Sequence, residues 1–101
     1  FQARAGSPEL NCCSVNGPRS IGMLSEWAVM TAPDGIAFNW YGPSRFAVRL
    51  PSGRKATLTQ ETDFPRSGKV KIRVAPDAEE SFTLRLRVPG WSQRTEVRVN
   101  G

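Results

Sequence analysis

Two adjacent cysteines are the most reactive type of side chain in this sequence. Cys12 and Cys13 stand in the stretch ELNCCSVNGPR and are the only thiols among 101 residues. Four interpretations are open: a strained disulfide between neighbours, two thiols packed in a turn, ligands of a metal ion, or a reactive nucleophile. A zinc site needs about four ligands, and the chain contains no His and no second Cys pair. The residues alone leave these interpretations open.

The residues after the cysteines predict the start of a helix. Pro18 suits a first helical position behind Asn16 or Gly17. The positive end of the helix dipole would then favour a thiolate just ahead of it, and Arg19 would add positive charge. Asn16 is equally explained as a helix cap, and Arg19 as a residue with an acidic or sugar partner elsewhere.

The spacing of apolar residues changes near Pro33. Before it, Ile21, Leu24, Trp27 and Ala28 recur at helical spacing and predict one helix of about three to four turns. The sequence PDG then predicts a turn. After Gly35, the alternation of apolar and polar residues predicts six short strands, within IAFNWY, RFAVRL, KATLTQET, GKVKIRVA, FTLRLRV and TEVRV.

These elements predict a mainly β fold, an antiparallel sandwich of about six strands preceded by one helix. One helix can cover only a small part of a sheet. We therefore interpret residues 1–32 as the end of a helical domain and residues 33–101 as most of a β-domain. The first residue is Phe rather than Met, and the last residues read as a strand entering a turn. We therefore expect a piece of a longer chain.

The composition argues against two classes of protein. Lys and Arg number 14 against 9 acidic residues, a net charge of +5, but the basic residues alternate with apolar ones, as on the solvated face of a sheet. They form no clustered stripe with a recognition motif, so we expect no nucleic-acid partner. No apolar run approaches the length of a membrane span, so we also expect no membrane partner.

Several motifs in the same order resemble one enzyme family. CCSVNGPR resembles the Cys-Cys-x-x-Asn-x-x-Arg signature of glycoside hydrolase family 127, the β-L-arabinofuranosidase-like enzymes of bacteria. QETDFPRSGKVKIRV resembles the Glu-Thr-Asp-aromatic-Pro segment of that family and its Gly-Lys-Val strand. FTLRLRVPGWSQRTEVRVNG resembles its Leu-Arg-x-Pro-Gly-Trp and Val-x-Val-Asn-Gly close. The resemblance covers nearly the whole chain.

The resemblance implies different roles for the helical part and the β-sandwich part of the parent chain. In this family an (α/α)6 barrel carries the active site and β-sandwich material follows it, so the barrel upstream in the parent chain is the expected partner domain. Cys12 matches the cysteine that attacks the anomeric carbon, and Cys13 matches its zinc-binding neighbour. Both would bind zinc, with a further Cys and a Glu from earlier in the parent. The acid/base residue would also lie outside these residues, so the chain alone would be inactive.

Other polar and aromatic residues receive more ordinary interpretations. Glu9 has no matching position in the motif, and we interpret it as an exposed loop residue. Glu61 and Asp63 are two apart, which places like charges on one face of a strand and favours a turn or rim role over acid/base catalysis. The aromatic residues of interest could stack on sugars, although packing is the commoner role in β-domains; they are Trp40, Tyr41 and Trp91.

The sequence thus predicts part of a soluble retaining glycoside hydrolase that acts on a glycan, removing L-arabinofuranose or a related sugar by a zinc-bound cysteine. The alternative is a non-catalytic sandwich that binds carbohydrate or supports a neighbouring domain. The resemblance to bacterial enzymes suggests the cytoplasm or the periplasm, and no residue pattern identifies the compartment.

Overall fold

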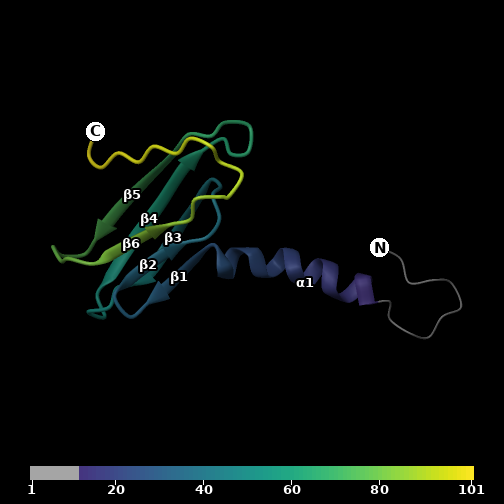
Figure 1. The fold of residues 1–101 in the computed structure, drawn as a ribbon. Coiled ribbons are helices and arrows are strands. Elements are labelled where there is room, and N and C mark those ends of the chain that lie inside the picture. The colour runs from purple at the N-terminus through teal and green to yellow at the C-terminus, as the bar shows by residue number, and fades with distance from the viewer. Residues whose placement is uncertain (1–11) are drawn as a thin grey trace, which may run out of the picture.

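A computed structural model describes residues 12–101 and contains one helix and six strands in two sheets. The helix α1 spans Cys12–Trp27 and projects from the sheets (Figure 1). The first three strands are β1 (Val29–Ala32), β2 (Gly35–Phe38) and β3 (Ser44–Arg49). The last three are β4 (Lys55–Thr62), β5 (Val70–Pro76) and β6 (Thr83–Leu86).

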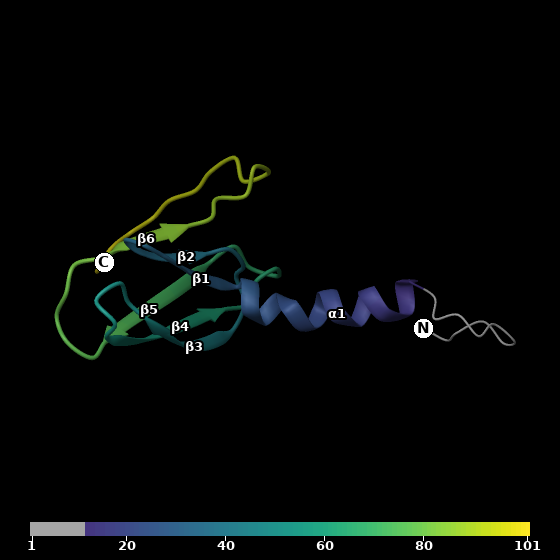
Figure 2. The same cartoon turned by 90° about the horizontal axis from the view of Figure 1, so that it is seen from below.

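The two sheets lie one above the other as the layers of a small sandwich (Figure 2). One sheet has the strand order β1-β2-β6 and the other β3-β4-β5. The mainly β sandwich predicted from the sequence is therefore confirmed. One pairing differs from the expected antiparallel pattern, because β2 and β6 run parallel. A parallel neighbour needs a long crossover connection, and the whole second sheet lies between these two strands in the sequence.

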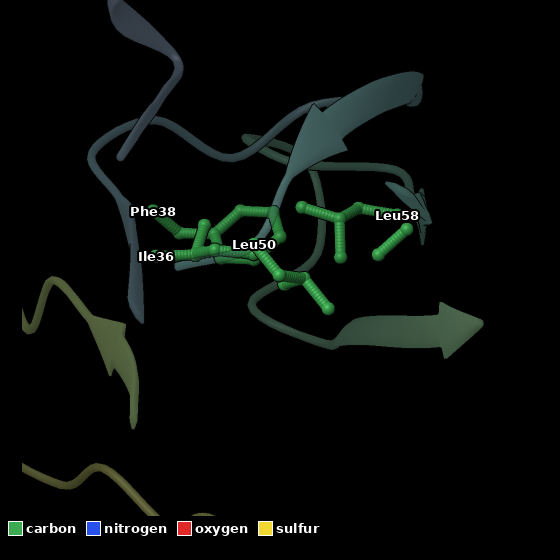
Figure 3. Close-up of a cluster of buried hydrophobic side chains, with 5 residues drawn as sticks. Ile36, Phe38, Leu50 and Leu58 are labelled. Atoms are coloured by element: carbon green, nitrogen blue, oxygen red, sulfur yellow. The ribbon is translucent and has the colours of Figure 1, made fainter. Parts of the chain in front are cut away.

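The core lies between the sheets and is small. Ile36 and Phe38 of β2 pack against Leu50 and against Leu58 of β4 (Figure 3). The alternation predicted for β2 holds for Ile36 and Phe38, whereas Trp40 lies beyond the end of the strand and is exposed. Burial of these few side chains supplies the main apolar stabilisation of the sandwich.

The central strand of the second sheet is the most buried one. β4 has the bounds of the predicted KATLTQET segment and places Ala56, Leu58 and Gln60 in the interior. Gln60 is a buried polar residue, and its amide donates hydrogen bonds to the carbonyl of Trp40 at 3.3 Å and the hydroxyl of Ser44 at 3.1 Å. This amide fixes the chain between β2 and β3.

Three details of the sequence-based prediction were wrong. The helix begins at Cys12, so Asn16 and Pro18 lie inside it rather than at its start. Residues 29–32 form β1 instead of continuing the helix, because they pair with β2 across the turn at residues 33–34. Residues 95–99 form no strand, because no strand of the described residues 12–101 is hydrogen-bonded beside them.

Two connections join the helix and the turn to the sandwich. The side-chain amide of Asn39 donates to the carbonyl of Trp27 at 3.0 Å, which holds the C-terminal end of α1 beside β2. Asp34, in the β1–β2 turn, forms a two-pronged ion pair with Arg85 of β6, both N–O distances being 2.7 Å. The hydrogen bonds from Arg85 lower the pKa of Asp34 to about 2.

Candidate active site

The cysteine pair stands in the first turn of α1, at the end of the helix farthest from the strands (Figure 1). Both side chains are exposed. Their sulfur atoms are 3.9 Å apart, whereas a disulfide requires about 2.05 Å. The strained disulfide between neighbours is therefore not formed in this structure.

The separation of the two sulfur atoms suits a shared metal ion. Two thiolates on a tetrahedral zinc ion, at a zinc–sulfur distance of about 2.3 Å, lie about 3.8 Å from each other. The observed sulfur–sulfur distance is 3.9 Å. Residues 12–101 contain no group of three or more metal-binding side chains. Within the described part of the chain, the pair can thus supply two of four zinc ligands. Glu9 lies outside the described residues.

The N-terminal end of α1 places the cysteine pair at the positive end of the helix dipole. Its first backbone N–H groups have no partners within the helix, and they carry the positive end of the helix dipole. No acidic residue lies in the first turn to oppose this field. Asn16 follows Cys12 by one turn and therefore lies on the same face of the helix. Asn16 lies inside the helix, which begins at Cys12, so it is not the cap that the sequence suggested.

Arg19 lies farther from the sulfur atoms than the sequence suggested. It is exposed and stands seven residues after Cys12 in the same helix. That separation is two helical turns, or about 10 Å along the axis. The charge of Arg19 therefore acts on the thiols across a solvated distance comparable to the Debye length.

A second candidate site is a small aromatic pocket at the other end of α1. Its volume is about 150 Å³, and its walls include Trp40, Tyr41 and Trp91. Trp91 is 72% exposed and Trp40 is 44% exposed. All three aromatic residues singled out in the sequence are thus brought together, from two segments that are far apart along the chain. Arg87 and Asn39 also line this pocket, and no sequence signal distinguished them from the other polar residues.

Hydrogen bonds hold the walls of the aromatic pocket in place. The Tyr41 hydroxyl donates to the carbonyl of Arg87 at 2.7 Å, and partial burial raises the pKa of this phenol. The amide N–H of Arg87 donates to the Phe38 carbonyl at 3.0 Å. The Arg87 guanidinium carbon lies 5.1 Å from the centre of the Trp40 ring, within the range of a cation–π contact. The pocket is therefore organised without a ligand.

Glu61 and Asp63 do not form a catalytic pair. Glu61 accepts a hydrogen bond from Arg73 at 2.6 Å and lies 3.8 Å from Lys71, and the Arg73 contact lowers the pKa of Glu61. A carboxylate held in its ionised form is a poor proton donor. Asp63 is exposed at the end of β4, where its carbonyl accepts the N–H of Arg66 in a turn. Both residues make polar contacts at the surface of the sheet.

Comparison with known proteins places this chain in a family. Residues 35–101 match the family model described as the middle domain of GH127 β-L-arabinofuranosidases. The chain belongs to glycoside hydrolase family 127. The structure is similar to the crystal structure of Ara127N-Se, a GH127 β-L-arabinofuranosidase from Geobacillus stearothermophilus T6, with a TM-score of 0.83 and 33% sequence identity. None of the curated proteins with which the sequence was compared matches it.

The match to the crystal structure extends over most of this GH127 chain and a small share of the other protein. It covers 89% of this chain and 14% of the Geobacillus enzyme. The match to the family model begins at Gly35, so α1 and its cysteine pair lie outside the matched residues. No helix among residues 12–101 is long and apolar enough to cross a membrane.

Proposed function

We propose that this GH127 chain is part of a retaining glycoside hydrolase that removes L-arabinofuranose, or a related sugar, from a glycan. Membership of the family is the observation that carries the proposal. The exposed thiol of Cys12 at the N-terminal end of α1 supports it, because a helix N-terminus favours the thiolate that attacks.

In this proposal Cys12 is the nucleophile. Its thiolate attacks the anomeric carbon, and a carbon–sulfur bond forms as the bond to the leaving oxygen breaks. An acid outside residues 12–101 donates a proton to that oxygen. Water then attacks the same carbon, the thiolate leaves, and the acid recovers its proton from the water. Two displacements at one carbon give net retention of configuration.

Cys12 and Cys13 would together hold a zinc ion, with a further Cys and a Glu from an upstream helical domain. The spacing of the two sulfur atoms supports this arrangement, as does the lack of competing carboxylates in the first turn of α1. Zinc supplies positive charge that keeps a thiol ionised at neutral pH. Because only two ligands lie in the described residues, the isolated 101-residue chain would be inactive.

The test uses the full-length protein that contains this chain. Zinc content and hydrolysis of p-nitrophenyl β-L-arabinofuranoside would be compared between wild type and Cys12→Ser. We expect about one zinc ion per wild-type chain and a loss of at least about a thousandfold in kcat for the variant. Ser25→Ala is the matched control, because it removes an exposed hydroxyl of the same helix and should leave both values unchanged.

Two results would refute the mechanism. One is a wild-type protein that is active without bound zinc after exhaustive chelation. The other is a Cys12→Ser variant with undiminished activity. Either result would leave the cysteine pair as ordinary helix residues, while membership of the family would stand.

A further inference from the structure

We propose that the aromatic pocket beside β2 and β6 is a second, non-catalytic binding site for one neutral sugar ring of a glycan. This site goes beyond the proposed function, because it uses none of the residues assigned to bond cleavage. Its central residues are Trp91, Trp40, Arg87 and Asn39.

The stacking platform of this pocket is Trp91. Its side chain is 72% exposed, and the residue lies within a tight turn in which the N–H of Ser92 donates to the Pro89 carbonyl at 2.9 Å. The turn fixes the backbone that carries the indole and leaves the ring open to solvent. Arg87 stands over the ring of Trp40, so Trp40 acts as a wall. Aromatic rings with an open surface and a nearby polar group suit ligands that are part apolar and part polar.

The polar groups of the pocket match sugar hydroxyls. Arg87 forms no ion pair with a carboxylate of residues 12–101, so its N–H groups can donate to a ligand. The amide nitrogen of Asn39 is used by the Trp27 carbonyl, whereas its oxygen has no hydrogen-bond donor in the described part of the chain and can accept. One donor group and one acceptor beside an aromatic face can bind two hydroxyls of the same ring.

The pocket itself has room for one ring. Its volume is about 150 Å³, and it opens into a larger groove of about 1010 Å³, which shares several of its lining residues and leaves space for the rest of a glycan. The backbone contacts of Tyr41, Arg87 and Trp40 hold this space open without a ligand. A preorganised site loses little conformational entropy on binding, which favours recognition of a small ligand.

The pocket is distant from the cysteine pair. The 16 residues of α1 separate the two, a length of about 24 Å. A sugar bound at Trp91 is therefore a different residue of the glycan from the one that reaches Cys12. Two attachment points on one glycan raise the overall affinity for long substrates and leave short ones unaffected.

The first experiment measures kinetics of the full-length protein with a long oligosaccharide that ends in β-L-arabinofuranose and with p-nitrophenyl β-L-arabinofuranoside. For Trp91→Ala we expect KM for the long substrate to rise by about threefold to tenfold, the range expected for one aromatic contact. We expect kcat for both substrates, and KM for the short one, to be unchanged. Trp27→Phe is the control, because Trp27 is also an exposed tryptophan, at 43%, and lies outside the pocket.

A second experiment reports binding independently of catalysis. The Cys12→Ser protein is labelled with 5-fluorotryptophan, and its fluorine NMR spectrum is recorded with and without arabinopentaose. Spectra of Trp91→Phe and Trp27→Phe assign the two resonances. We expect the Trp91 resonance to shift with added sugar and the Trp27 resonance to stay in place. This outcome would stand even if Cys12 were shown not to be the nucleophile.

The proposal is overturned if the Trp91 resonance does not respond to saturating arabinopentaose. It is also overturned if Trp91→Ala leaves KM for the long oligosaccharide at the wild-type value. In that case the exposed aromatic rings would belong to a contact with another part of the full-length protein.

Discussion

Gly35 stands where two backbones meet more closely than any side chain allows. It opens β2 and lies opposite Thr83 in the parallel pairing with β6. A Cβ atom at this position would lie 1.8 Å from the carbonyl oxygen of Thr83, and contacts under 3.0 Å are essentially never seen. The substitution Gly35→Ala therefore requires the start of β6 to retreat by about 1.2 Å or more, because the obstacle is backbone that cannot rotate away.

The free-energy cost of Gly35→Ala follows from what that retreat breaks. Overpacking costs about 1–3 kcal/mol. The N–H of Thr83 donates to the Asp34 carbonyl at 2.9 Å, and losing such a bond costs about 0.5–1.5 kcal/mol more. We expect a destabilisation of about 3 kcal/mol. For a domain of this size each kcal/mol lowers Tm by roughly 4–8 °C, so the loss should exceed about 10 °C in a thermal melt.

A second glycine supplies the matched control. A Cβ atom added at Gly42 meets nothing within 4 Å, so Gly42→Ala should change Tm by no more than about 2 °C. If Gly35→Ala melts within the same interval of the wild type, the close approach of β2 and β6 is not a feature of the folded protein. That result would refute the reasoning, and the parallel pairing with it.

Two further substitutions test the turn and the core. Asp34 has a pKa of about 2 in the folded chain against 3.8 ordinarily, so its ion pair with Arg85 stabilises the fold above pH 4 and stops doing so as the pH falls toward 2. The Tm difference between wild type and Asp34→Asn should therefore be constant at neutral pH and vanish over that acidic interval; a difference that persists at pH 2 would contradict this. Leu58 is fully buried, so Leu58→Ala should cost about 2–5 kcal/mol by urea unfolding, and a cost under about 1 kcal/mol would show that the cluster is not the core.

The alternation of apolar and polar residues predicted most strands correctly where turn residues marked their ends. β4 has the predicted limits, β6 lies within its predicted segment, and β3 and β5 each extend one residue beyond theirs, to Ser44 and Pro76. The PDG turn was also predicted correctly. These features are local, because the side-chain period of a strand and the preferences of Pro and Gly are set by neighbouring residues.

Burial was harder to predict than strand position. KATLTQET is a more polar segment than the other predicted strands, yet β4 is the centre of its sheet, with Gln60 in the interior. The side-chain nitrogen of Gln60 finds its partners in Trp40 and Ser44, which lie in another segment, whereas its oxygen has no partner in the described part of the chain. The aromatic pocket has the same origin, since Trp40 and Trp91 approach only because β6 returns beside β2.

The sequence by itself determined the family, the β-rich fold and the identity of the two thiols, because motifs, periodicity and residue types are properties of the chain. The roles of Cys12 and Cys13 remain predictions. Tertiary structure decided that residues 29–32 form a strand and that residues 95–99 do not. It also decided that β2 and β6 run parallel, with Gly35 against Thr83. A strand exists only beside a hydrogen-bonded neighbour, and which segments become neighbours is settled by the packing of the whole sandwich.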